Sequence, residues 1–234
     1  MNNLFLLLQV NVQGAADTLA TAGAKEIKLS YWDLAIKGGW VMIPIGILSI
    51  LAVYIFIERY LAIRKASKID DTFMNRIKDY IHDGKIDSAL SLCQSTDLPI
   101  ARMIEKGIGR IGRPLNDIEA AIENVGRQEI FKLEKGLPTL ASAAGGAPML
   151  GFLGTVTGMI RAFYNMAMAG NNLDIQVLSS GIYEAMVTTV AGLIVGIMGY
   201  FGYNILVASI EKLVNRLEAL TTEFMDLLNE PVKH

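Results

Sequence analysis

The chain has 234 residues and a net charge of −2, and 52% of its residues are hydrophobic, which gives a mean hydropathy of +0.39. This composition excludes an ordinary soluble domain of the same size and indicates a membrane protein. The single cysteine, Cys93, excludes an internal disulfide. The two histidines, His82 and His234, lie near no cysteine and in no span, so we expect no metal site and no histidine-based catalytic triad. The spans hold no His, Lys or Asp that could act as a base, so we expect no enzyme activity, and we expect no cofactor.

Residues 1–37 are interpreted as an N-terminal periplasmic or surface-lying arm. Their longest apolar run, Leu4 to Leu8, is too short to cross a bilayer and follows no Lys or Arg, so a secretory signal is not expected. The first transmembrane helix is predicted over residues 38–57. Trp40 and Tyr60 stand near its two ends, where amphipathic aromatic side chains favour the membrane interfaces.

Residues 58–135 form a charged insert, which we interpret as a cytoplasmic helical domain. It holds 14 Lys or Arg and 13 Asp or Glu, a balance that favours folded, solvated helices over a nucleic-acid-binding arm. Apolar residues recur at helical spacing, and turn residues predict breaks at residues 83–85, at Pro99 and at residues 112–114. One apolar stripe then continues towards the second span, so we expect that helix to begin well inside the cytoplasm.

Two long uncharged stretches follow, Gly136 to Ile160 and Ala185 to Ile210. Each is longer than the roughly 20 residues that a helix needs to cross a bilayer. They predict a second span over residues 136–161, a short periplasmic connection over 162–184 and a third span over 185–210.

Beyond the third span, residues 211–234 are predicted to form a cytoplasmic helical extension. A heptad-like apolar stripe runs from Ile210 to Leu228, before Asn229-Glu230-Pro231 stops it. A helix unbroken from about Asp174 to Leu228 would reach roughly 80 Å at ~1.5 Å per residue. The predicted fold class is an all-α membrane protein with three transmembrane helices, the second and third extending far into the cytoplasm.

Basic residues near the span ends orient the chain. The ends that we expect in the cytoplasm carry Arg59, Arg64, Lys65, Lys68, Arg127, Lys132, Lys135, Lys212 and Arg216. No Lys or Arg occurs from Ala162 to Tyr183 on the other side. By the positive-inside rule, the N-terminus lies outside and the C-terminus inside.

One side of each long span is made mostly of small residues. The second span carries Ala144, Ala147, Pro148, Gly151, Thr155, Gly158 and Ala162 on this side, and the third carries Ala185, Thr189, Gly192, Gly196, Gly199 and Tyr203. Close packing explains such a pattern, because small residues four apart let membrane helices approach each other. The two threonines also permit a second interpretation, a polar pathway along the helices.

Depth favours the polar pathway. Thr155 lies six residues before Arg161 and Thr189 lies five after Glu184, so antiparallel helices would place both hydroxyls at a similar depth. Glu184 is a functional candidate, although a solvated charge favoured by the dipole at a helix N-terminus is the alternative. Pro148 frees a backbone carbonyl, which a cavity or a partner would tolerate. No Asp, Lys or His occurs inside a span, so a proton path would need a partner's carboxylate.

These motifs resemble those of a known family. The segment from Ala147 to Ile160, APMLGFLGTVTGMI, looks like the second-span signature of the ExbB/TolQ/MotA proton-channel family. Glu184 to Ile197, followed by Tyr203-Asn204, resembles the third-span signature, and Gly84 to Cys93 is similar to a cytoplasmic region. Three spans fit ExbB and TolQ, whereas MotA proteins have four. The resemblance covers about residues 31–228 and is strongest to ExbB.

The resemblance implies a homopentamer in the inner membrane of a Gram-negative bacterium, with a periplasmic N-terminus and a cytoplasmic C-terminus. The second and third spans would line a central pore that holds a dimer of an ExbD-like single-pass partner, which supplies the missing carboxylate. It also implies that Thr155, Thr189 and Glu184 line the proton pathway. The residues that would pack the helices at the pore are Gly151, Pro148, Gly158, Gly192 and Gly196.

The predicted function is a motor subunit that couples proton-motive force, through the ExbD-like partner and a TonB-like protein, to TonB-dependent outer-membrane transport. The alternatives are a TolQ-like subunit of the Tol-Pal envelope-constriction system and a non-conducting membrane scaffold. Protons are the coupling ion, and no nucleic-acid partner is expected. The chain has Ile197-Met198 where many ExbB and TolQ sequences have Ile-Pro, so the bend that this proline gives is not predicted here.

Overall fold

The structure is a computed structural model that describes residues 38–68, 71–169 and 175–229, and the arm predicted over residues 1–37 lies outside them. The described residues form helices and turns, with no strand among them. The helices are α3 (Met42–Ala66), α4 (Asp71–His82), α5 (Ile86–Ser95), α6 (Pro99–Ile108), α7 (Leu115–Glu134), α8 (Leu137–Ala169) and α9 (Ile175–Asn229). The all-α prediction is confirmed for this part of the chain.

Turn residues separate the helices where the sequence predicts breaks. Gly84 follows α4 with a φ of +70°, a conformation that glycine adopts at little cost. Pro99 is the first residue of α6 and Pro114 precedes α7 as its N-cap. At both positions the missing N–H of proline removes no helical hydrogen bond, so proline favours a helix start there.

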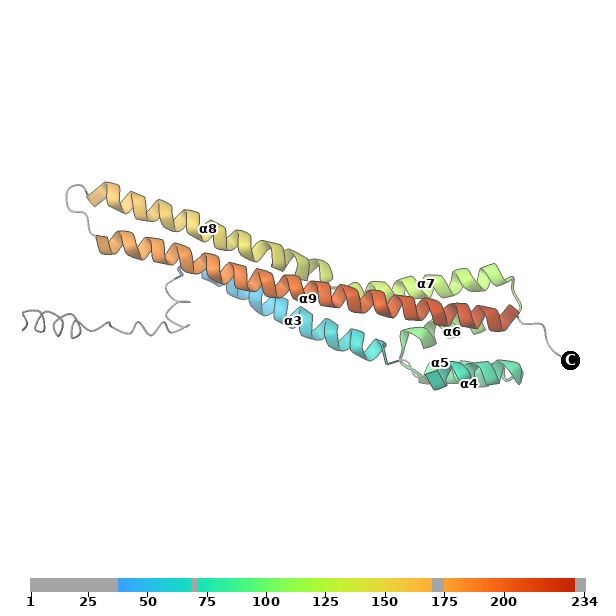
Figure 1. The fold of residues 1–234 in the computed structure, drawn as a ribbon. Coiled ribbons are helices and arrows are strands. Elements are labelled where there is room, and N and C mark those ends of the chain that lie inside the picture. Colours follow the sequence, from blue (N-terminus) through green and yellow to red (C-terminus); the bar gives the residue numbers. More distant parts are fainter. Residues whose placement is uncertain (1–37, 69–70, 170–174, 230–234) are drawn as a thin grey trace, which may run out of the picture. The chain divides into compact units, whose positions relative to one another are not determined.

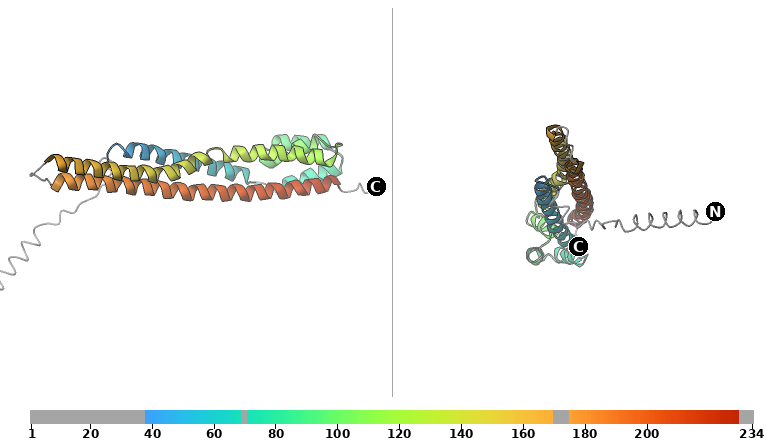
Figure 2. Two further views of the ribbon diagram at one scale, coloured as in Figure 1. Left: turned by 90° about the horizontal axis from the view of Figure 1, so that it is seen from above. Right: turned by 90° about the vertical axis from the view of Figure 1, so that its left-hand side faces the viewer.

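The longest element is α9, whose 55 residues run unbroken from Ile175 to Asn229. Figures 1 and 2 show α9 beside the antiparallel α8 over its first half and beside α7 over its second half. The first described helix, α3, packs against both α8 and α9. The predicted unbroken helix is confirmed, and it passes without interruption through Ile197 and Met198.

The second long span differs from the continuous helix that the sequence predicts. α7 ends at Glu134, and Gly136 has a φ of +90° before α8 begins at Leu137. A Cβ added to Gly136 would lie 3.3 Å from Cγ2 of Ile55 on α3. The apolar stripe of the insert therefore belongs to a separate helix, because glycine lets the chain turn where other residues would be strained.

The apolar stripes predicted in the insert and in the third long helix meet in one core. Ile77 of α4, Ile104 of α6, Ile122 of α7, and Leu217 and Phe224 of α9 are each at most 1% exposed. Full burial of one such side chain contributes about 1.5–3 kcal/mol. This core therefore holds the second half of α9 against the helices of the insert.

Three stretches of the described chain, carried by α3, α8 and α9, are long and apolar enough to cross a membrane. Large apolar side chains such as Ile50, Phe152 and Phe201 are more than half exposed on these helices. Water disfavours so much apolar surface. These sides of the helices therefore face lipid or other membrane helices.

Candidate functional site

Small residues make the contact between α8 and α9. A Cβ added to Gly192 would lie 2.5 Å from the carbonyl oxygen of Ala147 and 3.0 Å from Cα of Gly151. A Cβ added to Gly158 would lie 2.9 Å from Cβ of Ala185. The two backbones can approach only because these positions lack larger side chains. The small sides predicted for the two spans thus meet each other within one chain.

Pro148 lies inside α8. The carbonyl of Ala144, four residues earlier, therefore loses its usual helical donor. The proline ring lies against Gly196 of α9, and a Cβ added to Gly196 would be 3.0 Å from the Ala144 carbonyl oxygen. The carbonyl that Pro148 frees faces the backbone of α9 in the same chain.

The hydroxyls of Thr155 on α8 and Thr189 on α9 are hydrogen-bonded to each other. Each hydroxyl also lies 3.1 Å from the carbonyl oxygen of Gly151. A hydroxyl has a single hydrogen to donate. Two arrangements therefore satisfy the group: Thr155 donates to Thr189, which donates to Gly151, or Thr189 donates to Thr155, which donates to Gly151. The group can change its hydrogen-bond direction by rotating two hydroxyls, with no movement of the backbone.

Two neighbouring threonines differ from this pair. Thr188 is fully buried in the contact, where its hydroxyl donates to the carbonyl of Ala185 at 2.8 Å and its side chain covers Gly154. Thr157 donates to the carbonyl of Leu153 on its own helix at 2.9 Å. Sequence reasoning left Thr188 out, although it lies three residues after Ala185 and four before Gly192 on the small side of α9. This helical spacing is a signal that could have indicated it.

Glu184 forms an ion pair with Arg161 of α8. Nη1 of Arg161 lies 3.3 and 3.4 Å from the two carboxylate oxygens. Because α9 begins at Ile175, Glu184 lies well inside the helix, and the alternative of a charge at the helix N-terminus does not hold. On its other side the carboxylate lies against Gly39, just before α3. Three segments of the chain therefore meet at this carboxylate.

Sequence reasoning treated Arg161 only as a charge at a span end. The spacing that places Thr155 opposite Thr189 also places Arg161 opposite Glu184, so the pair could have been predicted from the same argument. The structure pairs the two threonines with each other, and it pairs Arg161 with Glu184 closer to the C-terminal end of α8.

The membrane part of α8 and α9 contains no carboxylate. No charged residue occurs from Leu137 to Ile160 or from Ala185 to Ile210. Where the structure describes the chain, no group of three His, Cys, Asp or Glu side chains could hold a metal ion. The arrangement can donate and accept hydrogen bonds, but it carries no group of its own that would hold a proton at this depth.

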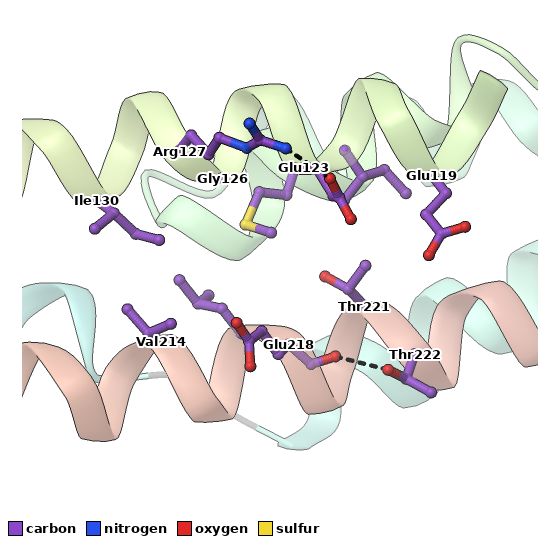
Figure 3. Close-up of a pocket in the computed structure, with 12 residues that line it drawn as sticks. Glu119, Glu123, Gly126, Arg127, Ile130, Val214, Glu218, Thr221 and Thr222 are labelled. Carbon is purple, nitrogen blue, oxygen red and sulfur yellow. Dashed lines mark hydrogen bonds and ion pairs between the residues drawn. The ribbon is translucent and has the colours of Figure 1, made fainter. Parts of the chain in front are cut away.

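A cavity of about 370 Å³ lies between α7 and α9. Figure 3 shows Glu119 and Glu123 of α7 and Glu218 of α9 among its lining side chains, with Arg127 paired to Glu123 at 3.0 Å. All its lining residues belong to the insert or to the second half of α9. The cavity is therefore separate from the threonine pair.

A family of known proteins matches the part of the chain that contains α8 and most of α9. The profile of the MotA/TolQ/ExbB proton channel family matches residues 95–219, more than half of the chain. The chain belongs to this family. The matched segment contains Thr155, Glu184 and Thr189, together with their neighbours Arg161 and Thr188.

Relatives within the MotA/TolQ/ExbB family carry two kinds of name. The biopolymer transport protein ExbB-like 1 of Synechocystis sp. is 29% identical over 198 residues, which cover 82% of this chain and 76% of the relative. The Tol-Pal system protein TolQ of Pseudomonas aeruginosa is 28% identical over 219 residues, covering 87% and 94%. The biopolymer transport protein ExbB of Neisseria meningitidis is 25% identical over 199 residues, covering 79% and 89%. The resemblance read from the two span signatures is confirmed.

Proposed function

We propose that this chain is the proton-pathway subunit of a membrane motor, which couples proton-motive force through an ExbD-like partner to TonB-dependent outer-membrane transport. The motor would be a homopentamer in the inner membrane of a Gram-negative bacterium, with the N-terminus in the periplasm and the C-terminus in the cytoplasm. Membership of the proton channel family supports the class of function. The hydroxyl pair of Thr155 and Thr189 is the observation that carries the proposal.

The hydroxyl pair suits a proton that arrives on a partner's carboxylate. Thr155 and Thr189 can donate to a carboxylate when it is charged, and they can accept from it when it is protonated. Hydrogen bonds to the charged form favour that form, whereas apolar surface favours the neutral form. A carboxylate that moves between the hydroxyls and the apolar sides of neighbouring helices would therefore take up and release its proton.

The ion pair of Arg161 and Glu184 supports a site of proton entry on the periplasmic side of the two threonine hydroxyls. A carboxylate that remains partly exposed at the end of an uncharged stretch can receive protons from water and pass them inwards. Arg161 holds the carboxylate of Glu184 in place, with its Nη1 atom 3.3 Å from one carboxylate oxygen. Protons are the coupling ion, and the partner supplies the group that crosses the uncharged stretch.

The test is proton uptake by liposomes that contain the chain with its ExbD-like partner. Thr155→Val and Thr189→Val keep the shape of the side chain and remove the hydroxyl. Each should slow uptake roughly tenfold, the equivalent of one lost hydrogen bond of ~1.4 kcal/mol. Thr157→Val is the matched control, since its hydroxyl bonds only its own helix. Unchanged uptake in an intact assembly of the Thr155 and Thr189 variants would favour a non-conducting scaffold.

A TolQ-like role in the Tol-Pal system is the second candidate, favoured by the match to the TolQ of P. aeruginosa over 94% of that protein. Deletion of the gene in its own organism distinguishes the two systems. We expect loss of TonB-dependent nutrient uptake, restored by the gene on a plasmid. Normal uptake combined with a defect in envelope constriction would assign the chain to Tol-Pal instead.

A further inference from the structure

A series of ion pairs joins the end of α3 to the insert. Nζ of Lys65 on α3 lies 2.7 Å from Oδ2 of Asp97, which stands in the turn before α6. Nη1 of Arg102 on α6 lies 2.8 Å from the other oxygen of Asp97, and its Nη2 lies 2.6 Å from Oε2 of Glu129 on α7. Lys132 binds the second oxygen of Glu129 at 2.6 Å. The series therefore runs from α3 through the start of α6 to the end of α7.

Arg59 of α3 closes this series. Its Nη1 donates to the backbone carbonyl of Lys132 at 3.0 Å. That carbonyl lies in the last turn of α7, where carbonyls have no helical donor and where a cation is favoured by the helix dipole. The contacts thus return to the helix from which they start. We call this set the polar ring, and its members are Arg59, Lys65, Asp97, Arg102, Glu129 and Lys132.

The two links from α3 to the insert differ in their exposure to water. The side chain of Arg59 is only 14% exposed, whereas Lys65 and Asp97 are 69% and 73% exposed. Exposed ion pairs contribute little and are weakened by salt. The hydrogen bond of Arg59 is therefore the stronger link, and a change at Asp97 can open the other link without disturbing a buried side chain.

The part of α3 just before Lys65 also lies beside the break between α7 and α8. Ile55 contacts Gly136, since a Cβ added to this glycine would lie 3.3 Å from Cγ2 of Ile55. Arg59, one helical turn later, binds the end of α7. α3 therefore contacts the chain on both sides of the point where the insert joins the membrane part of α8.

The opposite end of α3 lies against Glu184. Gly39 stands three residues before α3, and a Cβ added to it would overlap Oε1 of this carboxylate. The 25 residues of α3 cover roughly 37 Å at ~1.5 Å per residue. A helix keeps its length because each turn is hydrogen-bonded to the next. A displacement of one end of α3 along its axis is therefore felt at the other end.

We propose that the polar ring fixes the Ala66 end of α3 to the insert, so that α3 couples the position of the insert to the position of the Glu184 carboxylate. Hydrogen bonds at 2.6 to 3.0 Å restrict both distance and direction. The apolar contacts of Ile63 and Ala66, which are buried in the same region, are not directional and permit small shifts.

Coupling between two sites acts in both directions. A molecule that displaces the insert would therefore also displace Glu184, and a change at Glu184 would be felt in the insert. The consequence for proton entry rests on the function proposed above. The coupling itself is a property of the fold and can be measured without proton uptake.

A cycle of thermal unfolding midpoints of the full chain in detergent tests the coupling. The Arg59→Met/Asp97→Ala variant removes both links from α3 to the insert and opens the ring. The methyl group of Gly39→Ala overlaps Glu184, and the closed ring resists the shift of α3 that would relieve this overlap. We expect Gly39→Ala to lower the midpoint of the open-ring chain by about half as much as that of the parent, because only the strain of the positive φ remains.

Two controls accompany this cycle. Gly192→Ala overlaps Ala147 between α8 and α9, away from α3, so its loss should be the same in the parent and in the open-ring chain. Lys85→Gln opens an exposed ion pair outside the ring, so Gly39→Ala should cost as much in this background as in the parent. The open-ring chain should fold, since Ile63 and Ala66 remain in the core, and Asp97→Ala alone supplies a milder background.

Equal losses from Gly39→Ala in the parent and in the open-ring chain would overturn the proposal. An equally reduced loss for Gly192→Ala would overturn it as well, because opening the ring would then loosen the whole chain. Proton uptake by liposomes separates the coupling from the proposed function: opening the ring should restore part of the uptake that Gly39→Ala removes. A reduced loss of stability with no recovery of uptake would support the coupling and contradict proton entry at Glu184.

Discussion

Gly39 lies directly against the carboxylate of Glu184, although Gly39 precedes α3 and Glu184 lies inside α9. Gly39 has a φ of +67°. A Cβ added there would overlap Oε1 of Glu184 and lie 3.1 Å from its Cδ. Arg161 holds the same carboxylate from α8. The start of α3 therefore fixes the position of the carboxylate that we propose for proton entry.

The Gly39→Ala variant should be less stable and conduct more slowly. The positive φ costs a side chain about 1–3 kcal/mol, and the methyl group pushes Glu184 away from Arg161. We expect a lower midpoint of thermal unfolding in detergent and slower proton uptake in liposomes. Gly46→Ala is the control, because nothing lies within 4 Å of its added Cβ and alanine favours a helix by about 0.5–1 kcal/mol.

A double-mutant cycle separates two costs of Gly39→Ala, the overlap of the added methyl group with Glu184 and the backbone strain of the positive φ. In the background of Glu184→Ala, the Gly39→Ala change meets no carboxylate and should cost only the strain of the positive φ. Equal costs in both backgrounds would contradict the contact between Gly39 and Glu184. The cycle uses unfolding midpoints of the full chain, so it does not depend on proton uptake.

Gly192 supports a second prediction, on the contact between α8 and α9. The methyl group of Gly192→Ala would lie 2.5 Å from the carbonyl oxygen of Ala147, so the two backbones must move apart. Overpacking of this kind costs about 1–3 kcal/mol. The separation also weakens the hydrogen bond between Thr155 and Thr189, so proton uptake should fall with stability.

Gly145→Ala is the matched control for Gly192→Ala. Gly145 lies inside α8, and nothing lies within 4 Å of its added Cβ. We expect the control to unfold at the same temperature as the parent chain or above it, because alanine is the better helix former. Equal unfolding midpoints for the two variants would show that α8 and α9 do not pack through Gly192.

Local signals in the sequence predict much of this fold. Gly84, Pro99 and Pro114 end or begin helices through their own backbone geometry, which no distant contact needs to support. The heptad-like stripe after Ile210 predicts the long α9, because apolar residues such as Leu217 and Phe224 recur on one side of the helix. Both side chains are buried in the core. The similar spacings of Thr155 from Arg161 and of Thr189 from Glu184, along antiparallel helices, likewise predict that the two threonines lie at the same depth.

Tertiary contacts decide what the sequence leaves open. The sequence pattern of small residues along a membrane helix is the same whether that side lines a pore or packs against a neighbouring helix. The contact of Gly151 with Gly192 shows that the two small sides pack against each other within the chain. The turn at Gly136 depends on a positive φ that helix propensity does not reveal. The contact of Gly39 with Glu184 joins segments far apart in the sequence, so no local pattern indicates it.

Glu129 of the insert supports a prediction on pH. This buried carboxylate accepts hydrogen bonds from Arg102 and Lys132, both at 2.6 Å. Burial alone would raise the pKa of Glu129, but the hydrogen bonds from the two cations outweigh it and lower the pKa below its ordinary value of 4.5. The pairing stabilises the folded state above pH 4.5, and this stability is lost as the pH falls towards the lowered pKa.

The Glu129→Gln variant should therefore lose about 1.5–3 kcal/mol at pH 7, and the difference from the parent chain should shrink as the pH falls below 4.5. Thermal unfolding over a series of pH values measures this. Glu123→Gln on the same helix is the control, since its pair with Arg127 is exposed and contributes only about 0.3–0.5 kcal/mol. A constant difference between Glu129→Gln and the parent at all pH values would contradict the paired carboxylate.

Cys93 should resist alkylation as long as the insert is folded. It is buried in α5, and this burial raises the pKa of its thiol to about 12, with a smaller contribution from Glu105. Because the thiolate is the reactive form, both the low exposure and the raised pKa protect the sulfur. We expect no maleimide labelling of the native chain at pH 7.5 and complete labelling after unfolding in dodecyl sulfate.

A chain with Ser209→Cys provides the comparison for Cys93, because the hydroxyl of Ser209 is exposed on α9 and lines an open cavity between α3 and α9. Its new thiol should react under native conditions while Cys93 does not, which gives one labelled site per folded chain. Native labelling of Cys93 at the rate of the residue 209 thiol would show that the packing of α5 opens readily. If Cys93 is inert, thiols placed on α3, α8 or α9 can report contacts between copies without removal of the natural cysteine.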